Sequence, residues 1–344
     1  MANEYLKWLS SHTQSAFWHD SAIVAEADEA MASGAVGMTT NPFLINATLK
    51  ADPATWKPVM AGLADSLKGQ ERAEEVMRRV TTHLAAKVRP IYDSTGGKQG
   101  FVCAQTNPNK PCDDELMLEQ ARRYAKWAPN IAIKLPATAA GIRAFEVLAS
   151  EGINVVATVS FTVPQCLSIG AAFQRGVERA RKNGITPGIG IAVLMVGRLD
   201  DYLRDVAQDA QADVRESDII QAGTAAIKRS YHVFKEKNYE AVLMPAGCRG
   251  AYHITELAGA KMTMSIAPGI AKMLAGEKPP FKEGIGNEVP ADAIKRLSLL
   301  REFNKAYDPD GMTDEEFITF GSTNRTLTQF VIMGWNQLEA YKPE

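Results

Sequence analysis

NIAIKLPAT, residues 130–138, places one lysine, Lys134, inside an otherwise aliphatic run. Large aliphatic side chains stand at positions 131, 133 and 135 and alternate with the lysine, which is the period of a β-strand. An unpaired charge inside such a strand costs several kcal/mol. A lysine on a strand can also lie at a sheet edge, with its amine reaching solvent. The environment of Lys134 therefore depends on whether the sheet has an edge.

Seven further apolar segments resemble this one, and helical patterns lie between them. Near-continuous hydrophobicity is typical of strands that are buried on both faces of a parallel sheet. Eight strands that alternate with helices predict an α/β fold, a (β/α)8 TIM barrel, although a doubly wound open sheet gives a similar alternation. A closed barrel has no edge, so it directs Lys134 inward. The other segments are FWHDSAIV (17–24), GAVGMTTNP (34–42), GFVCAQT (100–106), INVVATVSF (153–161), IGIAVLMVG (189–197), EAVLMPAG (240–247) and KMTMSIAP (261–268).

Two regions contain more helical sequence than a minimal (β/α)8 barrel requires. Residues 46–87 contain enough helical sequence for two or three helices between the second and third strands. After the eighth strand, a segment rich in proline and glycine leads into polar helical sequence, with DPDGMTDEEF as a turn and helix start. We therefore expect a single domain, 1–344, with a barrel core at about 15–270 and a helical C-terminal extension at about 271–344. The apolar face of the final helix, which includes Phe330, Ile332, Trp335 and Leu338, must be buried, on the barrel or against another subunit.

Composition favours a small-molecule partner. The 344 residues carry a formal net charge of −2 without a block of like charge, which predicts neither nucleic-acid nor membrane binding. The start lacks the pattern of a signal peptide, and no apolar run is long enough for a membrane span, so we expect a cytoplasmic protein. The four cysteines form no C-x-x-C pair and the five histidines no H-x-x-x-H pair, so we expect no metal and no disulfide frame.

Catalytic groups of a barrel stand at the C-terminal ends of its strands. Polar residues occupy these ends here. They are Asp20 after the first strand, Thr40 and Asn41 after the second, Gln105 and Asn107 at the third, Lys134 on the fourth, Thr158 and Ser160 at the fifth, Arg198 after the sixth, Arg249 after the seventh and Ser265 near the end of the eighth.

Three of these residue types suggest chemistry. Burial lowers the pKa of an amine, and a neutral lysine is the nucleophile that forms a Schiff base with a carbonyl. Asp20 can serve as a general acid and base or as the N-cap of a following helix. Arg198 can pair with Asp200 or Asp201 at the surface or bind an anion. Arg249 has no acidic neighbour in sequence, and two arginines after adjacent strands suit one phosphate or sulfonate group.

The chain resembles the transaldolases and the related fructose 6-phosphate aldolases. TTNPFLI (39–45) is similar to their TTNP segment, residues 134–161 to their lysine segment with its trailing EGIN, and MVGR (195–198) to their P-F-V-G-R. The similarity runs in order over about three-quarters of the chain. It implies a class I aldolase barrel without metal or other cofactor, in carbohydrate metabolism, with the pentose phosphate pathway or sulfoglycolysis as its setting.

The resemblance also implies residue roles. Lys134 forms a Schiff base with a ketose that carries a terminal phosphate or sulfonate, and Asp20 moves the proton of the C4 hydroxyl. Thr158 orients the catalytic water, and Thr40 and Asn41 hold substrate hydroxyls. Asn107 and Ser160 are further substrate-binding candidates, and Arg198 and Arg249 hold the anion. The dihydroxyacetone unit passes to an aldehyde acceptor, in a protein that can be a homo-oligomer.

Four positions depart from the family pattern. Gln105 replaces the glutamate that works with the catalytic water in transaldolases, and a glutamine is a poor proton acceptor. Met195 replaces a tyrosine of the aldolases. Val193 and Gly247 replace serines that assist phosphate binding, which leaves fewer neutral donors beside the arginines. A sulfonate carries one charge and is less demanding than a phosphate, so 6-deoxy-6-sulfofructose is a second candidate donor.

Two further functions are compatible with the same residues. Gln105 resembles the glutamine of the fructose 6-phosphate aldolases, so the chain could release free dihydroxyacetone instead of transferring it. A barrel with altered site residues could also be a non-catalytic sugar-phosphate-binding protein. The presence of Lys134, Asp20 and both arginines favours an enzyme over such a binding protein.

Overall fold

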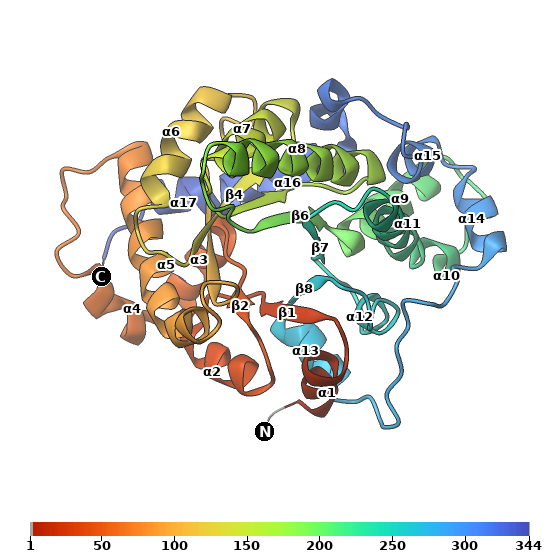
Figure 1. Ribbon diagram of the computed structural model, residues 1–344, viewed down its shortest axis with the longest axis horizontal. Helices are drawn as coiled ribbons and strands as arrows, with labels where there is room; N and C mark the ends of the chain where they lie inside the picture. Colours follow the sequence, from red (N-terminus) through yellow and green to blue (C-terminus); the bar gives the residue numbers. More distant parts are fainter. Residues whose placement is uncertain (1–2, 344) are drawn as a thin grey trace.

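Eight parallel strands form the centre of the molecule. The computed structural model describes residues 3–343. The strands are ordered β7-β6-β5-β4-β3-β2-β1-β8 in one sheet, and β7 lies against β8, so the ring is nearly closed (Figure 1). This order confirms the (β/α)8 barrel and rules out the doubly wound open sheet. The strands are β1 Ala16–His19, β2 Gly37–Met38, β3 Phe101–Gln105, β4 Ile131–Pro136, β5 Val155–Thr158, β6 Gly190–Leu194, β7 Val242–Pro245 and β8 Thr263–Ile266.

Several strands are shorter than the apolar segments that predict them. β1 ends at His19, and residues 20–23 form a loop before the first crossover helix. β2 has only two residues, because Asn41 caps a helix that begins at Pro42. Proline at the first helical position is compatible with a helix start but not with a longer strand. The polar ends of these two strands therefore lie in loops above the ring.

Crossover helices surround the strands in an outer layer (Figure 1). Their apolar faces pack on the sheet, which explains why the strands are hydrophobic on both sides. Among residues 3–343, no helix has both the length and the apolar character that a bilayer crossing requires. The helices outside the two decorated regions are α1 Glu4–His12, α2 Val24–Ala32, α6 Asp114–Tyr124, α7 Ala139–Ser150, α8 Val163–Lys182, α9 Val196–Asp209, α10 Glu216–Ile219, α11 Ala222–Glu236, α12 Tyr252–Thr255 and α13 Pro268–Leu274.

Three helices fill the connection between β2 and β3, as the sequence predicts. They are α3 Pro42–Ala51, α4 Pro53–Met60 and α5 Gly69–Ser94. The amphipathic stretch 216–240, in contrast, is divided into α10 and α11 rather than forming one helix. The break leaves the backbone N–H of Gly223 free to donate to the buried carboxylate of Asp200, at 2.8 Å.

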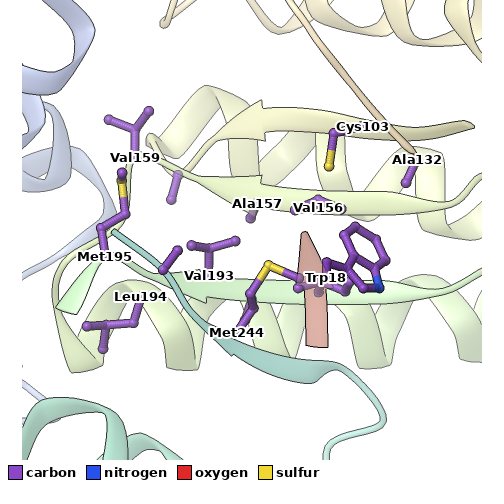
Figure 2. Packing of buried hydrophobic residues seen from close by; sticks show 14 of the residues in the cluster. Trp18, Cys103, Ala132, Val156, Ala157, Val159, Val193, Leu194, Met195 and Met244 are labelled. Atoms are coloured by element: carbon purple, nitrogen blue, oxygen red, sulfur yellow. The ribbon is translucent and has the colours of Figure 1, made fainter. Parts of the chain in front are cut away.

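Apolar side chains fill the barrel below its C-terminal end. Trp18, Cys103 and Met244 are turned toward one another in the space between the strands (Figure 2), and all three are buried. Cys103 pairs in register with Ala132, two residues before Lys134 on the same strand. Side chains two residues apart share a face of a strand. The lysine therefore lies one layer above an apolar floor.

The C-terminal extension wraps around the barrel. α14 Ala291–Leu297 and α15 Arg301–Tyr307 pack on α10 and α11, and a 3-10 helix, Asp314–Thr319, packs on α7 and α8. The chain then continues through α16 Gly321–Phe330, the π-helical turn Val331–Trp335 and α17 Asn336–Glu339. α16 contacts α9, the π-helical turn contacts α3, and α17 contacts α5. The final helical segment thus lies across α9, α3 and α5.

The final segment buries its apolar face on the barrel, with one exception. Phe330, Trp335 and Leu338 are buried, as the sequence predicts. The prediction is wrong for Ile332, which is 56% exposed. A π-helical turn holds more residues per turn than an α-helix, so it rotates residue 332 away from the face that the α-helical spacing predicts.

Candidate active site

Lys134 lies inside the barrel near the end of β4. Its side chain is buried, with the residue 5% exposed, and it forms no ion pair with any residue from 3 to 343. Gln105, the last residue of β3, is its register partner. The Oε1 atom of Gln105 is buried and accepts no hydrogen bond from the described residues. An unpaired amine and an unused acceptor therefore lie side by side on neighbouring strands.

A second buried lysine shows what a structural lysine looks like in this chain. Lys228 on α11 is 6% exposed, and its Nζ donates to Glu256, 3.2 Å away, and to the backbone carbonyls of Gly284 and Asn287, at 3.1 and 2.7 Å. Buried charges are normally satisfied in this way. Lys134 has no such set of hydrogen-bond partners among residues 3–343, and its charge instead lowers the pKa of the buried Asp20 carboxyl.

Asp20 lies at the barrel mouth directly after β1. Its backbone N–H donates to Ile266, at 3.0 Å, and its carboxylate is hydrogen-bonded by Ser265. Burial raises the pKa of Asp20, against the opposing effects of Lys134, Arg198 and the Ser265 hydrogen bond. The N-cap interpretation is wrong, because α2 starts at Val24 and has no side-chain cap.

Thr158 ends β5 beside a strained residue. Val159 has φ of 56°, a left-handed conformation that a β-branched side chain rarely adopts. The buried Gln165 stabilises this turn, since its Nε2 donates to the carbonyls of Val159 and Ala137, at 3.2 and 3.0 Å, and its Oε1 accepts from the N–H of Phe161, at 2.9 Å. These bonds fix the backbone just after Thr158 and thereby orient its side chain.

The remaining predicted substrate-binding residues carry hydrogen bonds within the fold. Thr40 donates to the carbonyl of Cys103 and Ser160 to that of Val193, both at 2.5 Å. Asn41 caps α3 through its side-chain oxygen, 2.9 Å from Leu44 N, which leaves its amide NH2 to donate. The roles of these residues in substrate binding stay predictions.

Asn107 forms three hydrogen bonds that order the loop after β3. Its Oδ1 accepts from Asn109 N, at 2.9 Å, and its Nδ2 donates to Gln70, at 3.1 Å. Its backbone N–H donates to Gln120. These contacts order the loop and use one N–H and one lone pair of the Asn107 amide, which leaves its second N–H to donate to a ligand.

Arg198, in the first turn of α9, is held by the C-terminal extension rather than by an aspartate. Its Nη2 donates to Gln329 Oε1, at 2.6 Å, and its Nη1 to Thr326, at 3.4 Å. Burial, and next the like charge of Arg249, lower the pKa of Arg198, although a guanidinium stays protonated at neutral pH. The predicted surface pairing of Arg198 with Asp200 or Asp201 is therefore not formed.

Arg249, in the loop after β7, pairs with Asp201. Its Nη2 and Nε lie 2.7 and 2.8 Å from one Asp201 oxygen, and its Nη1 donates to the carbonyl of Gly247. Gly197 makes this close approach possible, because a Cβ there would lie 2.4 Å from that carbonyl. The loop that bears Arg249 thus meets the first turn of α9, which bears Arg198.

A fully buried pair supports the Arg249 loop from below. His253 Nε2 lies 3.0 Å from Asp200 Oδ2, and both side chains are inaccessible to solvent. The other ring nitrogen, Nδ1, accepts from the backbone N–H of Arg249, at 3.1 Å. Asp200 also binds the first turn of α11 through Gly223, where the helix dipole favours a negative charge. The loop backbone is therefore anchored to two helices.

Four residues that shape the site have roles that sequence reasoning does not find. Ser265 stands at a strand end without a predicted role, although it binds Asp20. Gln165 and Gln329 give no chemical signal in sequence, and Asp201 is expected beside Arg198 rather than Arg249. Asp201 is 48 positions from its partner and Gln329 is 131 positions from its own, so only the folded chain pairs them.

The assembled site can perform covalent chemistry on a carbonyl with proton transfer. It combines an unpaired amine, a carboxylate with a raised pKa, an unused amide acceptor and two cationic side chains, from five different strand ends. A buried amine is the required nucleophile for a Schiff base, and a nearby carboxylate can move a proton.

Known proteins of similar sequence carry related names. A family model described as "Transaldolase/Fructose-6-phosphate aldolase" matches residues 17–318. Transaldolase 1 of Streptomyces avermitilis is 30% identical over 207 residues, 58% of this chain and 54% of that protein. A transaldolase of Neisseria meningitidis is 30% identical over 188 residues, 54% of each chain. The chain thus spans about half the length of these curated relatives.

Proposed function

We propose that the chain, which belongs to the transaldolase/fructose-6-phosphate aldolase family, transfers a dihydroxyacetone unit from a ketose to an aldehyde. The donor carries a terminal anion, and Lys134 is the Schiff-base nucleophile. The observation that supports this proposal most strongly is the buried amine of Lys134, which has no ion-pair partner among residues 3–343. A purely structural lysine is satisfied, as Lys228 is.

The proposed reaction uses four groups in sequence. The amine of Lys134 adds to the ketose C2 carbonyl and expels water to give a protonated Schiff base. The C3–C4 bond then breaks, its electrons enter the iminium to form an enamine, the C4 hydroxyl proton passes to Asp20, and the fragment that begins at C4 leaves as an aldehyde. The enamine attacks the acceptor aldehyde, whose oxygen takes the proton back from Asp20. Water, oriented by Thr158 and Gln105, finally hydrolyses the Schiff base.

Product analysis with and without an acceptor separates transfer from release. We expect a ketose donor alone to yield little free dihydroxyacetone, and addition of an acceptor aldehyde to yield the exchanged ketose. The reason is that release requires a proton at C3 of the enamine before water can hydrolyse the Schiff base, and the neutral amide of Gln105 is a poor source of that proton. Chromatography of the products measures both outcomes. Accumulation of dihydroxyacetone at the same rate in both mixtures would instead assign the chain to the aldolase activity.

A sulfonated ketose is the second candidate donor, and one contact favours it. Asp201 pairs with Arg249, whereas the guanidinium of Arg198 donates, within residues 3–343, to the neutral side chains of Thr326 and Gln329. The three side chains together carry one net positive charge. One net charge matches a sulfonate, which carries a single negative charge, better than a phosphate, which carries about −1.5 to −2.

A direct comparison of two donors tests this preference. We expect kcat/KM for 6-deoxy-6-sulfofructose to exceed that for fructose 6-phosphate by about 10-fold, the ratio that corresponds to about 1.4 kcal/mol of differential binding. Asp201→Asn serves as the matched variant, because it restores the second positive charge. It should shift the ratio toward the phosphate. A wild-type preference for fructose 6-phosphate removes the sulfonate proposal and leaves the transfer proposal intact.

A further inference from the structure

Helix α16 presents three polar side chains to the arginine after β6. Ser322 donates to the backbone carbonyl of Arg198, at 3.5 Å, and Thr326 and Gln329 accept from its guanidinium, at 3.4 and 2.6 Å. Positions 322, 326 and 329 are spaced by four and three residues, so they share one face of the helix. This face is turned toward the barrel mouth, since the residue that it contacts starts α9 directly after β6.

The helix is fixed at its other end as well. The π-helical turn that follows α16 places Gly334 against the backbone of Pro42 and Phe43, where a Cβ would lie 2.7 to 2.9 Å from their atoms. Asn46 Nδ2 donates to the carbonyl of Met333, at 3.0 Å. α16 and the turn after it are thereby anchored between helix α3, which follows β2, and helix α9, which follows β6.

The neutral character of Gln329 distinguishes its contact from the other arginine contacts nearby. Arg249 pairs with Asp201, Arg204 with Glu216 and Arg325 with Asp205. A carboxylate is the usual bidentate partner of a guanidinium, and it cancels the charge. Glutamine holds the side chain in place and leaves the charge of Arg198 available to a ligand.

The side-chain amide of Gln329 also has an NH2 group that can donate hydrogen bonds. An arginine side chain only donates, so the amide oxygen of Gln329 must face Arg198. The amide nitrogen then points elsewhere, and no residue from 3 to 343 accepts its hydrogens. The covalent geometry of the amide places this NH2 group next to the guanidinium. Val193 on β6 and Gly247 after β7 add no side-chain donors beside the two arginines.

We propose that α16 completes the anion site and that Gln329 is a specificity-determining residue, which orients Arg198 and donates a hydrogen bond from its amide to the terminal anion of the donor. This inference rests on the proposed function, because it concerns the same substrate. The substrate class is a ketose with a tetrahedral oxyanion at the end remote from its carbonyl. A neutral ketose of the same chain length makes no use of Gln329.

Borohydride trapping measured against donor concentration tests the role of Gln329. The donors are 6-deoxy-6-sulfofructose, fructose 6-phosphate and unmodified fructose, and intact-mass analysis reports the fraction of protein with an adduct on Lys134. Gln329→Glu places a carboxylate on Arg198, so the half-saturating concentration of both anionic donors should rise by about 10-fold or more. It should rise most for the phosphate, whose charge is larger, and stay unchanged for fructose.

Two further variants make the result specific. Gln329→Ala removes the amide without adding charge, and the half-saturating concentration of both anionic donors should rise by about 3- to 10-fold, in proportion to one hydrogen bond. Thr328→Ala changes an exposed neighbour on the same helix and should leave all three donors unaffected. Thermal unfolding of each variant reports whether α16 stays docked.

The results of these experiments separate the two proposals. If Gln329→Glu changes the anionic and neutral donors equally, or changes none of them, Gln329 has only a structural role or none, and the inference is overturned. If the wild-type protein forms no adduct at Lys134 with any donor, the proposed function itself fails. An adduct with normal saturation in Gln329→Glu rejects the inference alone.

Discussion

Replacing Lys134 with methionine will abolish turnover while leaving the fold intact. Methionine keeps an unbranched chain of similar length but has no nucleophile. We expect kcat to fall on the order of 10⁴-fold or more, the range seen when a covalent nucleophile is removed. The borohydride adduct should disappear completely. We expect only a small change in stability, because the gain from replacing a buried amine with an apolar side chain is offset by the loss of the charge that acts on the buried carboxyl of Asp20.

Lys228→Met provides the matched control for this result. Lys228 is equally buried, but its amine donates hydrogen bonds to Glu256 and to two backbone carbonyls. Its replacement leaves these acceptors unsatisfied and should cost about 1–3 kcal/mol of unfolding free energy. Activity per folded molecule and the Lys134 adduct should remain. Chemical denaturation and kcat are measured on both variants. Lys134→Met should lose turnover but not stability, and Lys228→Met should lose stability but not turnover. Residual turnover above about 1% of wild type in Lys134→Met contradicts the Schiff-base proposal.

Replacing Asp20 with asparagine will separate adduct formation from carbon–carbon bond cleavage. Asparagine keeps the shape of the side chain but cannot accept the C4 hydroxyl proton. We expect kcat to fall by about 10²- to 10⁴-fold, the usual contribution of a positioned acid or base. The borohydride adduct on Lys134 should persist, since Schiff-base formation precedes the step that needs Asp20. Loss of the adduct together with turnover would show that Asp20 acts earlier, and unchanged kcat would remove it from the mechanism.

Because the pKa of Asp20 is raised, Asp20→Asn should also affect stability, in the favourable direction, although it lowers kcat. Burial raises the pKa of the folded-state carboxyl above its unfolded value, so the folded state binds the proton more tightly. Stability from this group is therefore greatest below the unfolded pKa, about 3.9, and declines as pH rises through the folded pKa. Asn carries no charge, so Asp20→Asn should unfold at an equal or higher temperature than wild type at pH 7. In wild type, kcat should fall as pH drops through the raised pKa, because the base becomes protonated.

The fold is predictable from the sequence because its strongest signals are periodic. Eight apolar segments and the helical spacing between them define a barrel without knowledge of any contact. Boundaries are less well predicted: the apolar run 17–24 continues past the end of β1, because residues 20–23 form a loop rather than a strand. Ile332 shows a related limit, since a π-helical turn changes the period on which the prediction depends.

The candidate site is predictable where one residue type stands out without knowledge of its contacts. Lys134 stands out from its neighbours in sequence, and closure of the barrel forces it inward. The partners of Arg198 and Arg249 are not predictable, because hydrogen bonds between side chains that are 131 and 48 positions apart leave no periodic pattern. Gln165 escapes prediction for another reason. Its importance follows from the strained φ of Val159, which no property of the sequence displays.

The distance in sequence between Arg198 and Gln329 also sets an order of events during synthesis. A ribosome adds about 5–20 residues per second, so the 131 residues that separate them take roughly 7 to 26 s to make. Lys134 and Asp20 emerge earlier still. A nascent chain therefore contains Lys134 for many seconds before α16 exists to hold Arg198. If α16 completes the anion site as proposed, that site can form only after all of the barrel strands have been made.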